Sequence, residues 1–593
     1  MTPVRKVVTA GNCSSLRDRS ALRNVFSLIA ALISLAVVMP VPGFAQRLDG
    51  TLRVAVTDQS GASVSDANVS ATNEDTKVAT AATSDGDIYV FPTLLPGAYT
   101  ITAEKAGFKK FERQHVNVLP NQVTDAKAEM EIGSQTTTVT VEEEGDTGVK
   151  TTSSDLSAGI PGTVATQLPI SYIGGHVQEL AVILPNTTTQ PGGVAGDGGS
   201  VGGLRPRFNS FTIDGGDDNN FNTSGRLMPV IEDAVSDFTV LTNQFSAEYG
   251  HSAGGIFAVT TKSGTDDIHG EVHEYNRNRN YDAFNNQETE RGLKDRYDYN
   301  RMGASVGGPI IKGKLFYFGA FEYQDENKAS SGPTVNTPTA AGLVMLKSLA
   351  HDPAVVSILD QFATAAAATS TEDVTVGGTT TPIPVGIFQG LAPNFTHEYD
   401  FDIGVNWNTG NHSVRGRILY DRERQPQVNA VEPLPQFNGT RDQDGRKFIL
   451  DDAWTLTPTL VNNFTFAFTH FVGPDLVVPS KYADFPNVEV DDLGVDIGPD
   501  GCSPQSTVTN IYQWSDSVTK VIGKHTVKTG VEIRNNISPT VDLPRSRGEW
   551  DYATLSTLIN DQVPDGANGA LRGAGVGAFA ANFASIYGFV QDD

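Results

Sequence analysis

Several segments in the second half of the chain alternate strictly between apolar and polar residues. In 398–407, EYDFDIGVNW, every second residue is aromatic or aliphatic, and the residues between them are acidic, amide or glycine. Segments 412–420 (HSVRGRILY), 463–471 (NFTFAFTHF) and 525–534 (HTVKTGVEIR) alternate in the same way. A period of two predicts β-strands with one apolar and one polar face.

Such strands occur both in soluble sandwiches and in membrane barrels. We count about ten segments of roughly 9–11 residues each, the length that a tilted transmembrane strand needs. Aromatic residues such as Tyr399, Trp407 and Tyr420 lie toward segment ends, where an interfacial girdle is expected. We therefore predict a transmembrane antiparallel β-barrel over 265–593, with a soluble multi-sandwich protein as the alternative.

The barrel interpretation fixes which way the basic residues of these strands point. A cation on the lipid face at mid-bilayer costs about 2–4 kcal/mol. Arg415, Arg417, Lys528 and Arg534 are therefore expected to face the lumen. The longest loop, 326–396, carries a possible amphipathic helix around 339–367, and long loops on one side are typical of outer-membrane barrels.

The region 48–133 contains shorter alternating strands with turn signals at Asp58-Gln59-Ser60-Gly61, Asp85-Gly86 and Pro96-Gly97. This spacing predicts a small antiparallel β-sandwich of about seven strands.

The region 134–264 is looser. It holds a short β-prone segment, Thr138–Val141, followed by three glutamates and a glycine-rich stretch, PGGVAGDGGSVGGLRPRF, with loop character. It ends in EYGHSAGGIFAVTTKSGT (248–265). We expect Gly250, Gly254 and Gly255 to allow close packing of turns before a final strand of this domain.

The N-terminus predicts export. Basic residues precede the apolar stretch 25–39, VFSLIAALISLAVVM, and small residues follow. This pattern indicates a signal peptide over 1–45, cleaved between Ala45 and Gln46. A single membrane anchor is the alternative, although about 15 apolar residues are few for a bilayer.

The net charge and the cysteine content exclude some classes of partner and site. The formal net charge is −26, which argues against nucleic acid as a partner, because a phosphate backbone requires a basic face. Cys13 would leave with the signal peptide and Cys502 would remain alone, so neither a disulfide nor a thiolate metal site is expected.

Three motifs resemble binding or catalytic sites but lack the residues or the spacing that those sites require. Gly308–Leu315 fits G-x-x-x-x-G-K, but Leu315 replaces the hydroxyl residue and no helix pattern follows, so we predict a turn between strands. Asp214–Asn220 lacks the spacing of a calcium loop and also predicts a turn. His269 and His273 are four apart, but on a predicted strand that spacing separates them by about 13 Å. We expect no enzyme activity, no metal and no cofactor.

Within the first region, one set of residues matches a known family pattern. These residues are Val56-Thr57-Asp58, Gly61-Ala62-Ser63-Val64, Ala67-Asn68-Val69, Thr83-Ser84-Asp85-Gly86, Phe91, Leu95-Pro96-Gly97-Ala98-Tyr99 and Ala106-Gly107-Phe108. Together they resemble the carboxypeptidase regulatory-like domain. The resemblance implies a transthyretin-like, carbohydrate-binding-like β-sandwich without a catalytic role.

A second set of residues spans 211–319. It comprises Phe211-Thr212-Ile213-Asp214-Gly215, Val240-Leu241-Thr242-Asn243, Phe245-Ser246-Ala247-Glu248-Tyr249-Gly250, Ser252-Ala253-Gly254-Gly255, Thr261-Lys262-Ser263-Gly264-Thr265, His269-Gly270, Gly307-Gly308-Pro309-Ile310 and Phe316-Tyr317-Phe318-Gly319. These motifs resemble Oar-like TonB-dependent outer-membrane receptors.

This second resemblance implies a TonB box region and an α+β plug over 134–264, with the plug inside the barrel and the plug and the N-terminal domain on the periplasmic side. It implies the inner-membrane TonB complex and outer-membrane lipid as partners, and a glycan, peptide or siderophore as the transported solute. Thr138, Val139, Thr140 and Val141 are in a suitable place for the TonB box, which pairs with TonB by strand addition. The alternative is that these four residues form the last strand of the first domain or a linker after it.

The chain ends in SIYGFVQDD, within a predicted strand. About ten strands cannot close the 22-stranded barrel typical of such transporters, so we expect a fragment that lacks the closing strands. The rival functions are a secreted or surface β-rich binding protein without transport and, with less support, a hydrolase carrying a binding domain.

Overall fold

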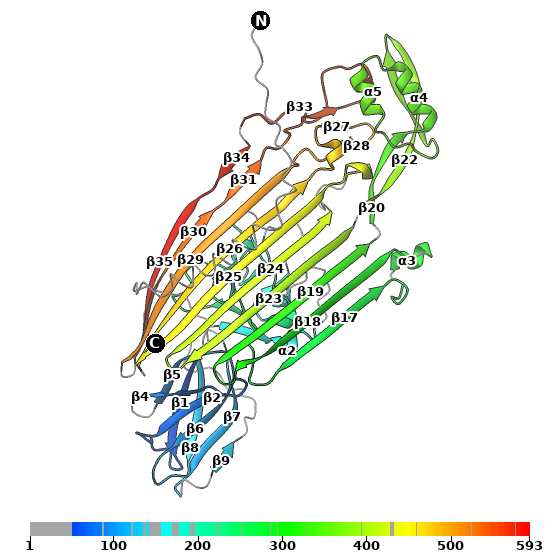
Figure 1. Ribbon diagram of the computed structural model, residues 1–593. Coiled ribbons are helices and arrows are strands. Elements are labelled where there is room, and N and C mark those ends of the chain that lie inside the picture. The colour runs from blue at the N-terminus through cyan, green and yellow to red at the C-terminus, as the bar shows by residue number, and fades with distance from the viewer. Residues whose placement is uncertain are drawn as a thin grey trace. The chain divides into compact units, whose positions relative to one another are not determined.

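The computed structural model describes residues 50–592 except 86–87, 120–122, 134–137, 142–155, 169–176, 190–195, 222–223, 251, 285, 293, 329, 393, 427–431, 458, 523–524 and 576 (Figure 1). The predicted signal peptide, with Ala45 and Gln46, lies outside the described residues. Strands dominate the described part of the chain, as the alternation predicts.

The first domain is a two-sheet sandwich. One sheet has the strand order β4-β5-β1-β8 and the other has the order β3-β2-β6-β7-β9. The inward residues of β1 illustrate the packing, because Leu52, Val54 and Val56 are fully buried and alternate with partly exposed neighbours. The strands are β1(Gly50–Asp58), β2(Asn68–Asn73), β3(Ala79–Ala81), β4(Thr83–Asp85), β5(Ile88–Leu94), β6(Gly97–Glu104), β7(Lys110–Val118), β8(Val123–Met130) and β9(Thr138–Val141).

The expectation of a purely antiparallel sandwich is wrong at two pairs. β8 runs parallel to β1, with Leu52 opposite Thr124, and β9 runs parallel to β7, with Lys110 opposite Thr138. The reason for the first pair is topological. β7 belongs to one sheet and β8 to the other, so the chain crosses between sheets instead of turning back beside itself. The segment Thr138–Val141 is therefore an edge strand of the sandwich.

The second domain, which we call the plug, is built on a five-stranded sheet of order β10-β15-β16-β13-β14. Its centre is β16, whose six residues are all buried. Close packing is required at Gly254 and Gly255, where an added Cβ would lie 2.6 Å from Asn209 Oδ1 and 2.9 Å from Val201 Cγ2. At Gly250 the same test meets nothing within 4 Å, so the expectation of close packing is wrong there.

The plug elements are mostly short. They are β10(Leu156–Pro161), α2(Gly162–Ala165), η1(Val177–Ile183), β11(Thr187–Thr188), β12(Ser200–Val201), η2(Pro206–Phe208), β13(Ser210–Ile213), β14(Gly216–Asp217), η3(Glu232–Ala234), β15(Val235–Asn243) and β16(Ile256–Thr261).

The third part is one long sheet, which we call the wall. Its ten long strands follow one another in the order β17-β18-β19-β23-β24-β25-β26-β29-β30-β35, all pairs antiparallel, as Figure 1 shows. They are β17(His269–Asn278), β18(Tyr297–Ile311), β19(Leu315–Lys328), β23(Phe395–Thr409), β24(His412–Pro426), β25(Thr440–Thr457), β26(Leu460–Val477), β29(Gln505–Ile522), β30(His525–Ile537) and β35(Phe583–Asp592). Short strands β31(Pro539–Asp542) and β34(Ala578–Ala580) extend β29.

The number of alternating segments is confirmed, but their predicted length is too short. Strand lengths run from 10 residues in β17 to 18 in β25. Alternation marks only the part of a strand that has one apolar and one polar face. Beyond it, as in the start of β25, TRDQDGRK, both faces are polar, and the ladder of backbone hydrogen bonds continues without that signal.

The two faces of the wall separate as predicted. On β23, Phe401 and Ile403 are 43% and 51% exposed on the outer face, whereas Asp402 is 1% exposed on the inner face. The four basic residues expected in the lumen face inward and are buried or nearly so: Arg415, Arg417, Lys528 and Arg534.

Two small sheets lie in the loops between wall strands. One has the order β20-β22-β21 and the other β28-β27-β32-β33, and they share a hydrophobic core. The predicted helix at 339–367 is two helices, because Asp352 caps the second and Pro353 begins it. The elements here are α3(Asn286–Arg291), β20(Ser330–Pro338), α4(Ala340–Leu349), α5(Pro353–Leu359), β21(Ser370–Val376), β22(Thr379–Ala392), η4(Pro435–Phe437), η5(Ser480–Tyr482), β27(Asn487–Val490), β28(Val495–Ile497), β32(Glu549–Tyr552), α6(Leu555–Ile559) and β33(Ala570–Leu571).

Among the described residues, no helix combines the length and apolar character needed to cross a membrane.

The orientation of the wall yields a test at Ile403, in the middle of β23 on the outer face. We expect Ile403→Arg to destabilise the folded protein by about 2–4 kcal/mol, because the cation is placed in hydrocarbon. Ile403→Leu is the control and should change stability little. Urea unfolding in lipid vesicles measures both, and equal stability of the two variants would contradict the assigned faces.

Candidate functional site: the contact between plug and wall

An acidic hairpin of the plug is buried against the inner face of the wall. It consists of β13, the turn at Asp214-Gly215 and β14, followed by Asp218. The turn has φ values of +44° and +73°, a conformation that glycine and aspartate tolerate. Asp214, Asp217 and Asp218 are 2%, 1% and 0% exposed. Carboxylates buried to this degree need counter-charges or donors.

Each of these carboxylates lies beside a basic residue of a different wall strand. Asp217 Oδ1 is 2.7 Å from Arg534 Nη1 on β30, and Asp218 Oδ1 is 3.1 Å from Lys447 Nζ on β25. Asp214 Oδ2 is 3.6 Å from Arg417 Nε on β24. The three pairs therefore join one short hairpin to three separate strands.

Neutral groups complete this contact. The backbone N–H of Asp217 donates to Gln513 Oε1 at 2.6 Å, and Gln513 Nε2 donates to the carbonyl of Gly215 at 3.1 Å. Lys447 Nζ also donates to the carbonyl of Asp217 at 2.6 Å. The wall thus binds the hairpin backbone as well as its side chains, which fixes the hairpin in one position.

A second ionic contact involves η3 of the plug and the first strands of the wall. Glu232 Oε2 lies 3.2 Å from Arg301 Nη2, and Asp233 Oδ2 lies 2.9 Å from His273 Nδ1. Glu322 of β19 joins both, at 2.8 Å from Arg301 Nε and 3.5 Å from His273 Nε2. This network and the hairpin contact lie on different strands, so the plug is held at separate places.

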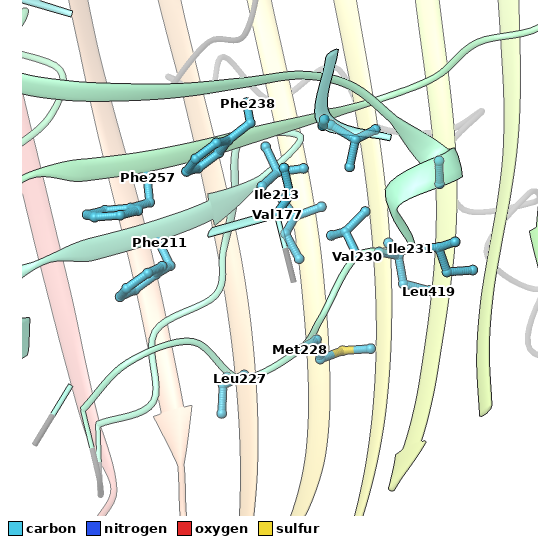
Figure 2. Close-up of a cluster of buried hydrophobic side chains, with 14 of the residues drawn as sticks. Val177, Phe211, Ile213, Leu227, Met228, Val230, Ile231, Phe238, Phe257 and Leu419 are labelled. Atoms are coloured by element: carbon cyan, nitrogen blue, oxygen red, sulfur yellow. The ribbon is translucent and has the colours of Figure 1, made fainter. Parts of the chain in front are cut away.

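Between the charged groups, the plug and the wall share one hydrophobic cluster (Figure 2). On the plug side, the Phe211 and Phe257 rings lie 4.9 Å apart. On the wall side, Leu419 is 2% exposed and belongs to the same cluster. At Gly445 an added Cβ would lie 3.0 Å from Met228 Cγ, so the absence of a side chain there makes room for the plug. Apolar burial therefore adds to the ionic contacts.

Burial changes the acidity of one member of the hairpin. It raises the pKa of Asp218 from its usual 3.8 to about 6, against the opposing effect of Lys447. The ion pair therefore carries a large desolvation cost, and its net contribution is smaller than its Coulomb energy. Removing one partner alone is the costly change, because it leaves the other charge buried.

The structure also locates the motifs considered from the sequence. Residues 312–314 form the predicted turn between β18 and β19, and Asp214-Gly215 is a turn as predicted. The contact of the Asp214–Asn220 segment with the wall was missed. His269 and His273 lie on β17, a strand as predicted, and His273 belongs to the η3 network.

Some described residues have the donor set for a metal ion. Asp233, Glu271 and His273 form one such group and Glu489, Asp491 and Asp551 another, each with one ligand atom per residue within 4.8 Å of the others. Two members of the first group, Asp233 and His273, already pair with each other in the η3 network. The second lies in the loop sheets and is partly exposed. Among the described residues, Cys502 is a free cysteine. Burial raises the pKa of its thiol, which disfavours the reactive thiolate.

A wall of long antiparallel strands, apolar outside and charged inside, with a separate domain bound to its inner face, defines the class of plugged outer-membrane β-barrels. A family model for the outer membrane beta barrel domain matches residues 260–593, and one for the carboxypeptidase regulatory-like domain matches residues 51–131. The chain belongs to the outer membrane beta barrel domain family.

The chain is also similar to individual proteins. The TonB-dependent transporter Oar of Myxococcus xanthus is 26% identical over 243 residues, which is 39% of this chain and 22% of that protein. The outer membrane transporter YddB of Escherichia coli has a TM-score of 0.47 at 10% identity, over 74% of this chain and 54% of that one. The siderophore receptor PirA of Acinetobacter baumannii has a TM-score of 0.42 at 14% identity, over the same shares.

These findings confirm the resemblance to Oar-like TonB-dependent receptors and the presence of a regulatory-like sandwich. They also confirm the predicted fold class and an outer-membrane location. The similar proteins are transporters and receptors, in agreement with the prediction of a non-enzyme. The aligned segment spans about a fifth of the length of Oar, 22%.

The buried pair between Asp218 and Lys447 yields the first test of the contact. We expect Lys447→Met to destabilise the docked plug by about 3–5 kcal/mol, because Asp218 remains as an uncompensated buried charge. Adding Asp218→Asn should restore most of that loss. Urea-induced loss of protease protection of the plug measures the effect.

The matched control is Arg446→Met at the next residue, where the exposed pair with Asp444 contributes at most about 1 kcal/mol. Equal effects of Lys447→Met and Arg446→Met would show that the hairpin contact does not hold the plug.

A second test uses pH. Because the docked Asp218 keeps its proton up to about pH 6 and the released carboxyl only to about 3.8, docking takes up a proton between these values. The stability of the docked plug should therefore fall as pH rises from 4 to 6. Asp218→Asn should make this dependence shallower. Part of the slope should remain, because burial also raises the pKa of Asp237 in the plug to about 6. An unchanged slope would contradict the assignment.

Proposed function

We propose that this protein is a TonB-dependent transporter of the outer membrane, in which TonB displaces the plug from the wall and a large or scarce solute then passes. The observation that carries the proposal is the contact itself. A domain bound inside the lumen through Asp217–Arg534, Asp218–Lys447 and the η3 network is a gate held by a few discrete polar contacts beside a shared hydrophobic cluster.

Polar contacts of this kind suit a gate that must open and close. The carboxylates and basic groups regain hydration when the plug leaves the wall, which offsets much of the lost Coulomb energy. A purely apolar contact would expose its whole area to water with no such compensation. The pairs also fix the position to which the plug returns, because each acid has its own basic partner.

The force would enter through the segment Thr138–Val141, the candidate TonB box, which precedes the plug in the chain. Its backbone pairs with β7 over four residues, at the edge of the sandwich sheet. TonB pairs with its targets by adding a strand. For such pairing the segment must separate from β7 or offer its free edge, and its short ladder makes separation inexpensive in hydrogen bonds.

The solute belongs, on this proposal, to the glycans, peptides or siderophores. Growth of a deletion strain on members of each class, with transport measured directly, assigns the solute.

The candidate box yields a test with an internal control. We expect Val139→Cys to form a disulfide with cysteine variants of the TonB C-terminal domain, because strand addition brings the two backbones within one strand spacing. The control is Thr80→Cys on β3, the opposite edge strand of the same sheet. Cross-linking at both positions or at neither would contradict the assignment of the box.

A further inference from the structure

Three carboxylates meet on the inner face of the wall, away from the basic residues that hold the plug hairpin. Glu398 and Asp400 lie on β23 and Asp421 lies on β24, directly opposite Asp400. One oxygen of each residue lies within 4.8 Å of the other two. The three residues are 1%, 5% and 1% exposed. Like charges this close and this buried repel strongly.

The groups around the Asp421 carboxylate are mostly acidic. Within the part of the chain that the structure describes, no hydrogen-bond donor reaches either of its oxygens, and none reaches Asp400 Oδ1. Two other buried acids of the wall have basic partners, whereas Asp402 on β23, like Asp421, accepts no hydrogen bond among the described residues. Glu322, on the neighbouring strand, lies 2.8 Å from Arg301 Nε, and Asp451 lies 3.5 Å from Arg415 Nη2. Asp421 differs from Asp402 in lying within a group of three carboxylates, and an unpaired buried carboxylate is one of the costliest arrangements in a protein.

Arg226 of the plug is a basic residue whose charge acts on this group, but it also pairs with other acids. Arg226 acts electrostatically on Glu398 and Asp421. Its guanidinium makes ion pairs with two other carboxylates, Glu179 and Asp197, both at 3.4 Å. One guanidinium spread over this many acids leaves the three-carboxylate group with a surplus of negative charge.

We propose that Glu398, Asp400 and Asp421 form a binding site for a divalent hard cation, of which Ca²⁺ is the best match. Carboxylate oxygens are the ligands that hard cations prefer, and calcium accepts mono- and bidentate carboxylates in flexible geometry, with carbonyls and water completing six to eight ligands. Mg²⁺ demands near-ideal octahedral geometry and dehydrates reluctantly, so it fits a dry carboxylate group less well. The two positive charges of the cation would offset most of the three negative charges of the carboxylates.

The position of this site links it to the plug. Asp421 lies opposite Gly445 in the ladder, and Met228 of the plug packs at Gly445. Two residues before Asp421, Leu419 belongs to the hydrophobic cluster shared with the plug. A cation held here therefore lies at the boundary between wall and plug. Because the docked form would bind it better, the cation stabilises docking by mass action. This inference is independent of whether TonB drives release.

The test is calcium titration by calorimetry of the full-length protein in detergent after chelator treatment. We expect the wild type to bind Ca²⁺ and the Asp421→Asn variant to bind it at least about tenfold more weakly, since affinity follows ligand charge. Bound calcium should also raise the urea concentration at which the plug loses protease protection. That shift should be absent in Asp421→Asn.

Two controls separate this site from other acidic groups. Glu326→Gln removes a buried wall carboxylate that already pairs with Lys328 at 2.7 Å, and should leave calcium affinity unchanged. Glu489→Gln removes one member of the acidic group in the loop sheets and should leave the calcium-dependent protection of the plug unchanged. If the wild type binds no Ca²⁺ in the millimolar range, or Asp421→Asn binds it as tightly, the site is not a cation site and the carboxylates share protons instead.

Discussion

A transmembrane strand has one place for a charged side chain, the face turned away from lipid. This constraint governs the rest of the molecule. It sends Arg417, Lys447 and Arg534 into the lumen together with many acids. Charged groups that are buried between the wall and the plug lose their hydration, so they need partners there. The acidic hairpin of the plug supplies those partners, and its sequence is therefore complementary to the wall.

How far the sequence predicts this structure depends on the range of the interactions. Alternation is a local signal, and it predicts the ten wall strands and their faces. The sandwich follows from turn residues at short spacing, although its parallel pairs do not, because they result from a crossover between sheets. The prediction of helix in the long loop is correct, but it gives one helix where the structure has two. Asp352-Pro353 is the signal that separates them.

The candidate site is set by distant pairs. Asp217 and Arg534 are 317 residues apart, and the pairing of one with the other is invisible to any local pattern. The sequence predicts a turn over Asp214–Asn220, which is correct for Asp214-Gly215, whereas Gly216–Asp217 is strand β14. A signal did exist. Lumen-facing cations were predicted on several strands, and an acidic turn in the domain expected to fill that lumen is their natural counterpart. The η3 network, which uses His273, carries no comparable signal.

On the proposed function, the contact between plug and wall is a gate that opens under force. Met228 is 1% exposed and packs at Gly445 of the wall, so it reports this contact directly. The measurement is maleimide labelling of Met228→Cys, in a Cys502→Ser background, in cells with active or inactive TonB. We expect slow labelling of this cysteine without TonB activity and fast labelling with TonB activity. Equal rates in both kinds of cell would contradict the claim that the plug leaves the wall.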